Sequence, residues 1–366
     1  MVITDYEILI VGGGPAGIST WLHLNKYYPE ISKKAILIEK EKFPREKLCG
    51  GALGGWTDYV LNDLDIDLDI PTVPINKVLC SFGKEIYEHN EKKFFKIVRR
   101  FEFDKLLVNN AKENGMTLSE NESFLNLKRK GDNLFVTTNK NCYKTKILIG
   151  ADGALSNVRK KMISMKKGNL APALEVFSPV NNKLDPEFEN NTVSIDFSPI
   201  NNGIQGYIWH FPCIYNKKPY MNHGIGDFRL NKIESKNKLN KVFDNALKSR
   251  QINIEQKNWN GHPIRWLAIN DTISNQNIIL VGDAAGIDPA IGGGIHLALS
   301  YGDLAAKTIS EAYENNDFSF SNYYSNFEEH IVGKYIFKLS YLAKKMYNNE
   351  MSPLEASKEI FSKKRK

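Results

Sequence analysis

The sequence predicts an α/β fold: a mainly parallel nucleotide-binding sheet, an interleaved β-sheet domain and a short helical C-terminus. Four short apolar runs that end in glycine or an acidic residue indicate buried parallel strands. Between the second and fourth runs, segments of alternating polar and apolar residues indicate a separate sheet. The chain has 366 residues, 42% of them hydrophobic, which is enough apolar material for a sizeable core.

The first forty residues have the order of one strand–helix–strand unit. The apolar run Tyr6–Val11 is followed by the glycine turn Gly12–Gly17, and residues 18–28 then have helical apolar spacing. A second apolar run, Ala35–Ile38, ends in Glu39. This order and length are those of a Rossmann-type βαβ unit.

Each residue that defines such a unit is needed for a physical reason. Gly12 permits a tight turn, Gly14 lets the backbone approach a pyrophosphate, and Gly17 allows close packing of the helix on the strand. The start of the helix offers free N–H groups and the positive end of its dipole to the phosphates. Glu39 lies where an acid accepts hydrogen bonds from an adenosine ribose. These residues predict binding of a dinucleotide, either NAD or FAD.

Two further glycine motifs decide between the two cofactors. The apolar segment Lys146–Gly153 ends in Gly-Ala-Asp-Gly, and the segment Asn277–Gly286 again runs into Gly-Asp. The glycines at 292–294 then open a helix. Together with Gly12-x-Gly-x-x-Gly17, these motifs resemble the flavoprotein hydroxylase superfamily. It is typified by para-hydroxybenzoate hydroxylase and includes geranylgeranyl reductases and flavin-dependent halogenases.

The resemblance implies FAD as the cofactor and a set of residues around it. Glu39 would hold the adenosine ribose, Asp283 the ribityl or pyrophosphate part, and the 293–295 backbone the flavin pyrimidine. Arg100 would reach the cofactor from a helix start, the alternative being an ion pair with Glu102 or Asp104. The implied cofactor-binding residues are Gly12, Gly14, Gly17, Glu39, Lys40, Arg45, Arg100, Asp152, Gly282, Asp283, Pro289, Gly293, Gly294 and Ile295.

The motifs predict a discontinuous domain organisation. We expect an FAD-binding domain from residues 1–75, 95–165 and 265–310. A β-sheet substrate domain is expected from 76–94 and 166–264, and C-terminal helices from 311–366. The substrate sheet would lie over the flavin, with the catalytic cleft between them.

Two segments are expected to form the cleft. Residues 44–51, which include Lys47 and Cys49, resemble the segment that passes near the flavin ring in geranylgeranyl reductase-like proteins. The strand-like segment Gly206–Pro212 resembles one shared by reductases and halogenases, and it contains Trp209 and His210. The candidate catalytic residues are therefore His210, Trp209, Cys49 and Lys47, and no residues are assigned to a metal. One departure is Gly293, where the family usually has glutamate.

The sequence-based hypothesis favours an FAD-dependent monooxygenase that oxidises an aromatic substrate. This would be a small molecule or a tryptophan side chain of a partner protein during quinone cofactor biogenesis. The alternatives are a geranylgeranyl reductase-like flavoprotein that reduces isoprenoid double bonds and a non-catalytic FAD-binding sensor or scaffold. Halogenation is less favoured, since the expected lysine and glycine–serine segment are not evident. With no second dinucleotide motif, electrons would come from an external donor, NAD(P)H or another reductant.

Net charge and cysteine content limit which other partners and which location we expect. The formal charge is +7, which suits an anionic cofactor or a lysine-rich surface, and no basic motif with interleaved aromatic residues indicates nucleic-acid binding. No run of about 18 apolar residues predicts a membrane span. The four cysteines are scattered, which is typical of reduced thiols, and we expect a cytoplasmic location.

Overall fold

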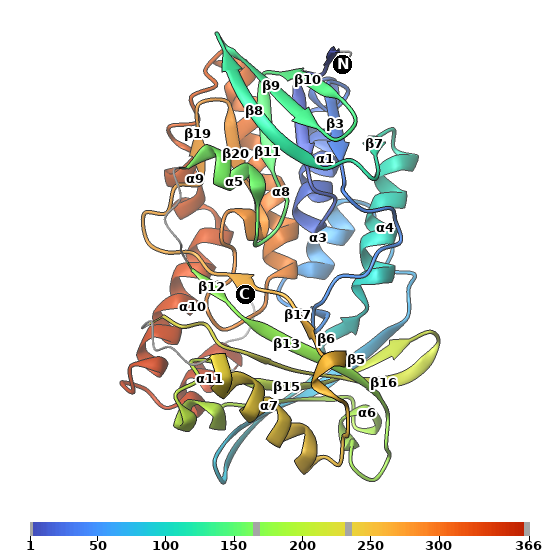
Figure 1. Ribbon diagram of the computed structural model, residues 1–366, viewed down its shortest axis with the longest axis vertical. Coiled ribbons are helices and arrows are strands. Elements are labelled where there is room, and N and C mark those ends of the chain that lie inside the picture. The colour runs from blue at the N-terminus through green and yellow to red at the C-terminus, as the bar shows by residue number, and fades with distance from the viewer. Residues whose placement is uncertain (1–2, 164–168, 231–235, 362–366) are drawn as a thin grey trace.

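The computed structural model describes residues 3–163, 169–230 and 236–361, and Figure 1 shows that they form two large sheets, one above the other. The upper sheet has six strands in the order β19-β20-β11-β2-β3-β7, all parallel except β19. In this spatial order the strands are Ser274–Asn275, Ile278–Leu280, Ile147–Gly150, Ile8–Val11, Ala35–Ile38 and Thr117–Ser119.

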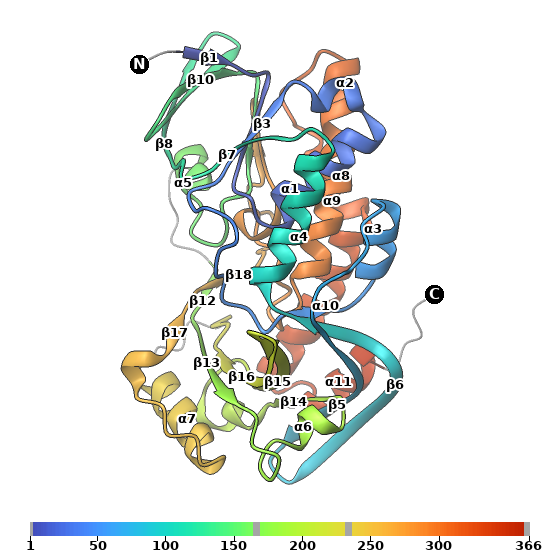
Figure 2. The same cartoon turned by 90° about the vertical axis from the view of Figure 1, so that its right-hand side faces the viewer.

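Both faces of the upper sheet are covered, which explains why its central strands are apolar throughout. Figure 2 shows the helices α1 (Pro15–Tyr27), α4 (Arg100–Glu113) and α8 (Ile295–Glu314) on one face. On the other face lies a four-stranded sheet in the order β1-β10-β9-β8. In that order its strands are Ile3–Asp5, Cys142–Thr145, Asn133–Thr138 and Phe124–Lys130.

The lower sheet has eight strands in the order β17-β13-β16-β15-β14-β5-β6-β4. In this order they are Asn260–Gly261, Ala173–Pro179, Lys218–Gly226, Ile208–Tyr215, Thr192–Asp196, Thr72–Phe82, Glu85–Val98 and Ala52–Leu53. Strands β5 and β6 form the long hairpin at the bottom of Figure 2, and they extend beyond residues 76–94 on both sides.

The two faces of the lower sheet differ in what covers them. Strand register places Trp209 opposite Gly224, and Gly224 opposite Glu175, so these three residues share what we call the inner face. His210 and His223 pair on the outer face. Helix α7 (Lys236–Ser249) packs on the outer face, whereas α10 (Ile331–Tyr347) and α11 (Pro353–Phe361) contribute to the apolar cluster on the inner side.

The predicted fold class is confirmed: a mixed α/β molecule with a parallel nucleotide-binding-type sheet, a second sheet and a helical C-terminus. The domain boundaries stay a prediction, and residues 362–366 of the predicted C-terminal segment lie outside the described residues. Across the described ranges, no helix combines the length and hydropathy needed to span a membrane.

The remaining elements are α2 (Pro29–Ser32), α3 (Thr57–Asp63), α5 (Asn157–Met162), α6 (Pro186–Glu189), α9 (Tyr323–Glu329), β12 (Leu170–Ala171), β18 (Ile264–Arg265) and the 3-10 turns η1 (Ser198–Asn202), η2 (Gln256–Asn258) and η3 (Gly282–Ala284).

Helices α1 and α8 meet at a small-residue contact that predicts a stability effect. A Cβ added at Gly302 of α8 would lie 2.5 Å from the backbone carbon of Ser19 in α1. We therefore expect Gly302→Ala to lower the free energy of unfolding by roughly 1–3 kcal/mol, because the helices must move apart. Urea unfolding checks this, with Gly54→Ala as control, since the nearest atom to its added Cβ is 3.9 Å away. Equal midpoints for the two variants would contradict the assignment.

Candidate functional site

The site begins at the turn between β2 and α1, where the backbone leaves no space for side chains. A Cβ at Gly12 would lie 2.4 Å from the carbonyl oxygen of Ala151 at the end of β11, and the Gly12 backbone has φ +110°. A Cβ at Gly17 would lie 2.1 Å from the Gly12 carbonyl oxygen. Both positions therefore need glycine for steric reasons, as the sequence motif predicts.

Gly14 differs, because it faces open space. The one atom near a Cβ added there is Arg45 Nη2, 4.0 Å away, and φ is −80°, which any residue adopts. No side chain caps the N-terminus of α1 at Gly14, so first-turn amides are available to an external anion. A side chain at Gly14 would fill this space. These features fit the pyrophosphate of a dinucleotide.

Glu39 is held at the end of β3 by backbone amides. Its Oε2 accepts a hydrogen bond from Gly13 N at 2.7 Å, and its Oε1 accepts one from Glu41 N at 3.1 Å. The side chain is buried. A carboxylate oxygen accepts two hydrogen bonds, so each oxygen keeps capacity for a ribose hydroxyl. Lys40, the next predicted residue, is exposed.

Two arginines and one aspartate form a buried charged cluster beside Glu39. Asp104 accepts two hydrogen bonds from Arg100, at 2.6 and 2.8 Å, and Arg45 Nη1 lies 3.1 Å from Asp104 Oδ2. Arg45 Nη2 donates to the Gly13 carbonyl at 3.3 Å, so it links the cluster to the glycine turn. Arg100 thus forms a buried ion pair with Asp104 rather than a surface one, and its contact with the cofactor stays a prediction.

The other two glycine motifs end at the same edge of the upper sheet. After β11, Asp152 accepts hydrogen bonds from Ser156 Oγ and the Asn157 and Val158 amides, so it caps α5. After β20, a Cβ at Gly282 would lie 2.6 Å from Ala16 Cβ, which brings Asp283 next to the start of α1.

The segment 288–294 turns the chain into α8. Asp288 is buried and accepts a hydrogen bond from Gly292 N at 3.1 Å, and burial raises the pKa of this carboxyl to about 7. Pro289 and Ile295 are buried, whereas Gly293 is exposed with φ +98°. Gly294 precedes the helix without a side-chain cap. A left-handed φ favours glycine over the glutamate usual in the family.

The segment 43–51 crosses from the upper sheet to the inner face of the lower sheet. A Cβ at Gly50 would lie 3.0 Å from the Phe211 ring and 3.5 Å from Trp209 Nε1. A Cβ at Gly51 would lie 1.9 Å from the Val98 carbonyl oxygen. The two glycines therefore allow this chain segment to lie between β6 and the aromatic side chains of β15, which brings Cys49 close to Trp209.

Charged groups from both sheets meet around Lys47. Burial lowers the pKa of Lys47, while Asp283 on the cofactor side opposes this change and the nearby Arg100 adds to it. His262, between β17 and β18, lies close to the same lysine. Burial and the Lys47 charge lower the pKa of His262 to about 4, so its imidazole is neutral at physiological pH.

A buried hydrogen-bond chain that the sequence analysis missed lies under Cys49. Trp209 Nε1 donates to Asn222 Oδ1 at 2.6 Å, and Asn222 Nδ2 donates to Glu175 Oε2 at 3.3 Å. Glu175 is 2% exposed, and the backbone amide of Cys49 lies near its carboxyl. The sequence signal was an acidic residue inside an apolar strand, but it does not show which face the residue occupies.

His210 is not brought together with the other three candidate catalytic residues. Its Nδ1 lies 2.7 Å from His223 Nδ1, and His223 Nε2 lies 2.9 Å from Ser178 Oγ, all on the outer face. Burial lowers the pKa of His210 well below its usual range, and the charge of Arg250 adds to this. A strand alternates its side chains, so His210 and its neighbour Trp209 point to opposite faces.

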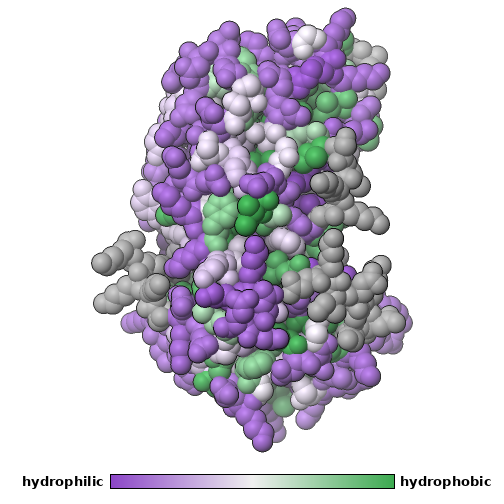
Figure 3. All heavy atoms as spheres, turned by 90° about the vertical axis from the view of Figure 1, so that its left-hand side faces the viewer, coloured by the Kyte–Doolittle hydropathy of each residue, from purple (hydrophilic) through white to green (hydrophobic). Residues whose placement is uncertain are grey.

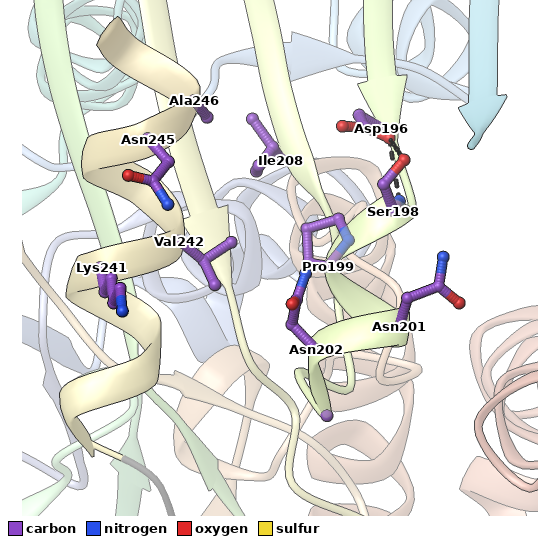
Figure 4. A pocket seen from close by; sticks show the side chains of 11 residues that line it. Asp196, Ser198, Pro199, Asn201, Asn202, Ile208, Lys241, Val242, Asn245 and Ala246 are labelled. Atoms are coloured by element: carbon purple, nitrogen blue, oxygen red, sulfur yellow. Dashed lines mark hydrogen bonds between the residues drawn. The ribbon is translucent and has the colours of Figure 1, made fainter. Parts of the chain in front are cut away.

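The outer face has a hollow of its own, between α7 and the turn η1. It has a volume of about 740 Å³, and Figure 4 shows Asp196, Lys241 and Asn245 among the side chains around it. Because Ile208 lines it from the outer face, this hollow lies on the opposite side of the lower sheet from Trp209 and Glu175. Figure 3 shows that hydrophobic side chains gather at the level between the two sheets on the face opposite to that of Figure 2.

The open space at Gly14 predicts a selective loss of cofactor. We expect Gly14→Val to abolish FAD binding, since the side chain would occupy the pyrophosphate space, without a large loss in stability of the apoprotein. Absorbance of the released flavin and thermal unfolding measure the two effects. Gly17→Ala should instead impair folding, and His89→Ala, on β6, should leave FAD content intact. Equal FAD content in Gly14→Val and His89→Ala would contradict the assignment.

The raised pKa of Asp288 predicts a pH-dependent stability. The folded state favours the protonated carboxyl, so its contribution is present below about pH 4 and is lost as the pH rises towards 7. Asparagine does not titrate. Relative to Asp288→Asn, we expect the wild type to lose up to about 1.4 kcal/mol per pH unit in this window. Urea unfolding of both proteins across these pH values checks this, and parallel stability curves would refute it.

Comparison with known sequences gives relatives along the whole chain, although no family model matches. The chain is 29% identical to digeranylgeranylglycerophospholipid reductase 3 of Methanosphaera stadtmanae, over 97% of this chain and 90% of the relative. It is 28% identical to a digeranylgeranylglycerophospholipid reductase of Thermoplasma acidophilum, over 86% of this chain and 80% of that one.

Comparison with solved structures gives neighbours from both enzyme classes considered above. A geranylgeranyl bacteriochlorophyll reductase-like protein of Thermoplasma acidophilum superposes with a TM-score of 0.76 at 22% identity, over 99% of this chain and 91% of that one. PqsL, a probable FAD-dependent monooxygenase of Pseudomonas aeruginosa, superposes with a TM-score of 0.70 at 12% identity, over 98% and 100% of the two chains.

A further neighbour, the flavin-dependent brominase Bmp2, superposes with a TM-score of 0.68 at 19% identity, over 96% and 94% of the two chains. These three superpositions, each below 25% identity, show a shared fold. The predicted resemblance is confirmed: the chain has the fold of the FAD-dependent oxidoreductase superfamily.

Proposed function

We propose that this protein is an FAD-dependent reductase that saturates carbon–carbon double bonds of an isoprenoid lipid. The observation on which this rests is the position of the Cys49–Gly51 segment, which lies against Trp209 and Phe211. The sequence relatives named digeranylgeranylglycerophospholipid reductases support the same choice, because they align along most of the chain at 28–29% identity. The proposal reverses the order of the two hypotheses drawn from the sequence alone.

The surroundings of this segment suit a hydrocarbon substrate. On the inner face, Tyr207 and Trp209 have ring centroids 6.2 Å apart, and Phe197 lies 5.6 Å from Tyr207. Apolar and aromatic walls bind an isoprenoid chain by removing its surface from water. FAD, when bound, supplies a hydride from its reduced ring. The protein would then hold the alkene against the ring and exclude water from it.

Three side chains have proposed roles in this arrangement. Cys49 would contact the substrate next to the site of reduction, since its backbone lies beside Trp209 and Glu175. Trp209 would form one wall, fixed by its hydrogen bond to Asn222. Lys47, between Asp283 and Arg100, would supply positive charge at the cofactor side of the cleft. A lysine with a lowered pKa also exchanges a proton more readily near neutral pH.

A second candidate function is the aromatic monooxygenase of the sequence hypothesis. The observation that favours it is the superposition with PqsL over nearly all of both chains. That likeness, at 12% identity, is one of fold. Under this candidate the substrate is a small aromatic molecule or a protein-borne tryptophan, and an external donor reduces the cofactor.

The two candidates predict different reactions of the anaerobically reduced holoenzyme. We expect a glycerophospholipid with geranylgeranyl chains to reoxidise the flavin without O2, as seen by rapid-mixing absorbance, and to gain hydrogen, as seen by mass spectrometry. Cys49→Ala should slow this step by roughly tenfold or more, because it changes the wall next to the reacting carbons. Cys142→Ala is the control, since Cys142 lies on β10, away from the cleft.

The opposite result would identify the other candidate. Strict dependence on O2, with consumption of an aromatic compound and no anaerobic reoxidation by the lipid, would reject the reductase and favour the monooxygenase.

A further inference from the structure

Glu175 is a buried acid beside the Cys49 segment that the proposed function does not yet use. Glu175 projects from β13 onto the inner face, where strand register aligns it with Gly224 and Trp209. The glycine matters, because a Cβ at Gly224 would lie 1.9 Å from the Trp209 ring. The Trp209 ring therefore lies over Gly224, and the carboxyl of Glu175 reaches the same layer of side chains as the proposed substrate wall.

The two carboxyl oxygens of Glu175 differ in their hydrogen bonds. Its Oε2 accepts a hydrogen bond from Asn222 Nδ2 at 3.3 Å, and the backbone amide of Cys49 lies near the carboxyl. Within the described ranges, Oε1 is buried and has no hydrogen-bond partner. A buried polar atom without a partner is costly, so such an atom in a cleft is a candidate for contact with a ligand or for holding a proton.

The charged surroundings of Glu175 are few. Lys47 approaches from the segment 43–51 and Arg99 from the residue before α4, while the thiol of Cys213 on β15 faces the same space. Strand β17 brings the uncharged Asn260 opposite Glu175. Burial raises the pKa of Glu175 to about 7, although the Asn222 hydrogen bond and the two cations oppose this. The acid is therefore protonated in an appreciable fraction of molecules at neutral pH.

Reduction of an alkene needs a proton as well as a hydride. One alkene carbon receives the hydride from the reduced cofactor, the π bond breaks, and the neighbouring carbon takes a proton. We infer that Glu175 Oε1–H donates this proton, so that Glu175 is a catalytic residue of the proposed reduction. The carboxylate left behind faces Lys47 and Arg99, and it regains a proton from solvent before the next turnover. A two-electron donor re-reduces the cofactor.

The inference rests on the proposed function, and the experiment separates the two. The first measurement uses FAD-bound, oxidised protein without substrate: infrared difference spectra over a pH titration. We expect a protonated-carboxyl band that disappears as the pH rises through about 7. Asp288 contributes a second such band, so the difference between wild type and variant is decisive: the Glu175 part should be missing in Glu175→Gln and present in Glu187→Gln. Glu187 is the matched control, because it is equally buried but pairs with Arg250 outside the cleft.

The second measurement follows reoxidation of the anaerobically reduced holoenzyme by the geranylgeranyl glycerophospholipid. In the wild type its rate should fall as the pH rises above about 7, because deprotonated Glu175 has no proton to donate. In Glu175→Gln it should be roughly 100-fold slower or more and lose this pH dependence, and Glu175→Asp should restore part of the rate. Reduction of the flavin by dithionite should be unchanged in every variant.

The outcomes distinguish a failure of the proposed function from a failure of the role of Glu175. No flavin reoxidation by the lipid in the wild type would reject the proposed function and the proton donor with it. Reoxidation with the same rate and pH profile in Glu175→Gln would leave the reductase standing and overturn the role of Glu175. The absence of a titrating band that depends on Glu175 would overturn that role whatever the substrate.

Discussion

The arrangement of this molecule depends on one steric constraint, the close approach of backbones where β2, β11 and α1 meet. Gly12 lies against the Ala151 carbonyl, and Gly17 lies against Gly12, at separations that no side chain allows. This contact points the N-terminus of α1 at the end of the sheet and leaves open space in front of Gly14. It thus creates the charge and the shape that a pyrophosphate requires.

A second close approach joins the two sheets. Gly50 and Gly51 let the segment 43–51 lie against Phe211, Trp209 and Val98. The same segment begins near the cofactor side, where Arg45 contacts Asp104 and the Gly13 carbonyl. One stretch of chain therefore links the glycine turn before α1 to the inner face of the lower sheet, the two places where we propose that cofactor and substrate bind. Substitutions in it should affect both cofactor binding and turnover, unlike those in the outer-face histidine chain.

Burial shifts the pKa values of the titratable groups near the Cys49 segment and the glycine turns so that their neutral forms are favoured. Burial raises the pKa of Glu175 and Asp288 to about 7 and lowers that of Lys47 and His262. Perturbed groups of both signs in one cleft are typical of sites that move protons. On the outer face, burial likewise lowers the pKa of His210 and His223, but no cofactor-binding motif is near them. A shifted pKa alone therefore does not identify the site. The position of the group relative to the glycine turns identifies it.

The sequence by itself determined the strands and the glycine turns, because these depend on local rules of hydrophobic period and backbone conformation. The choice of FAD over NAD came from the resemblance of the glycine motifs to the flavoprotein hydroxylase superfamily. The strand expected at 206–212 occurs as β15, with shifted ends. Only the tertiary structure decided which side chains share the cleft. Strand alternation puts His210 and Trp209 on opposite faces, but only the tertiary structure shows that Trp209 is the one on the inner face, and it brings Glu175 to Cys49 across more than a hundred residues of chain. Such meetings depend on strand pairing and the crossing of the 43–51 segment, long-range contacts that no local pattern encodes.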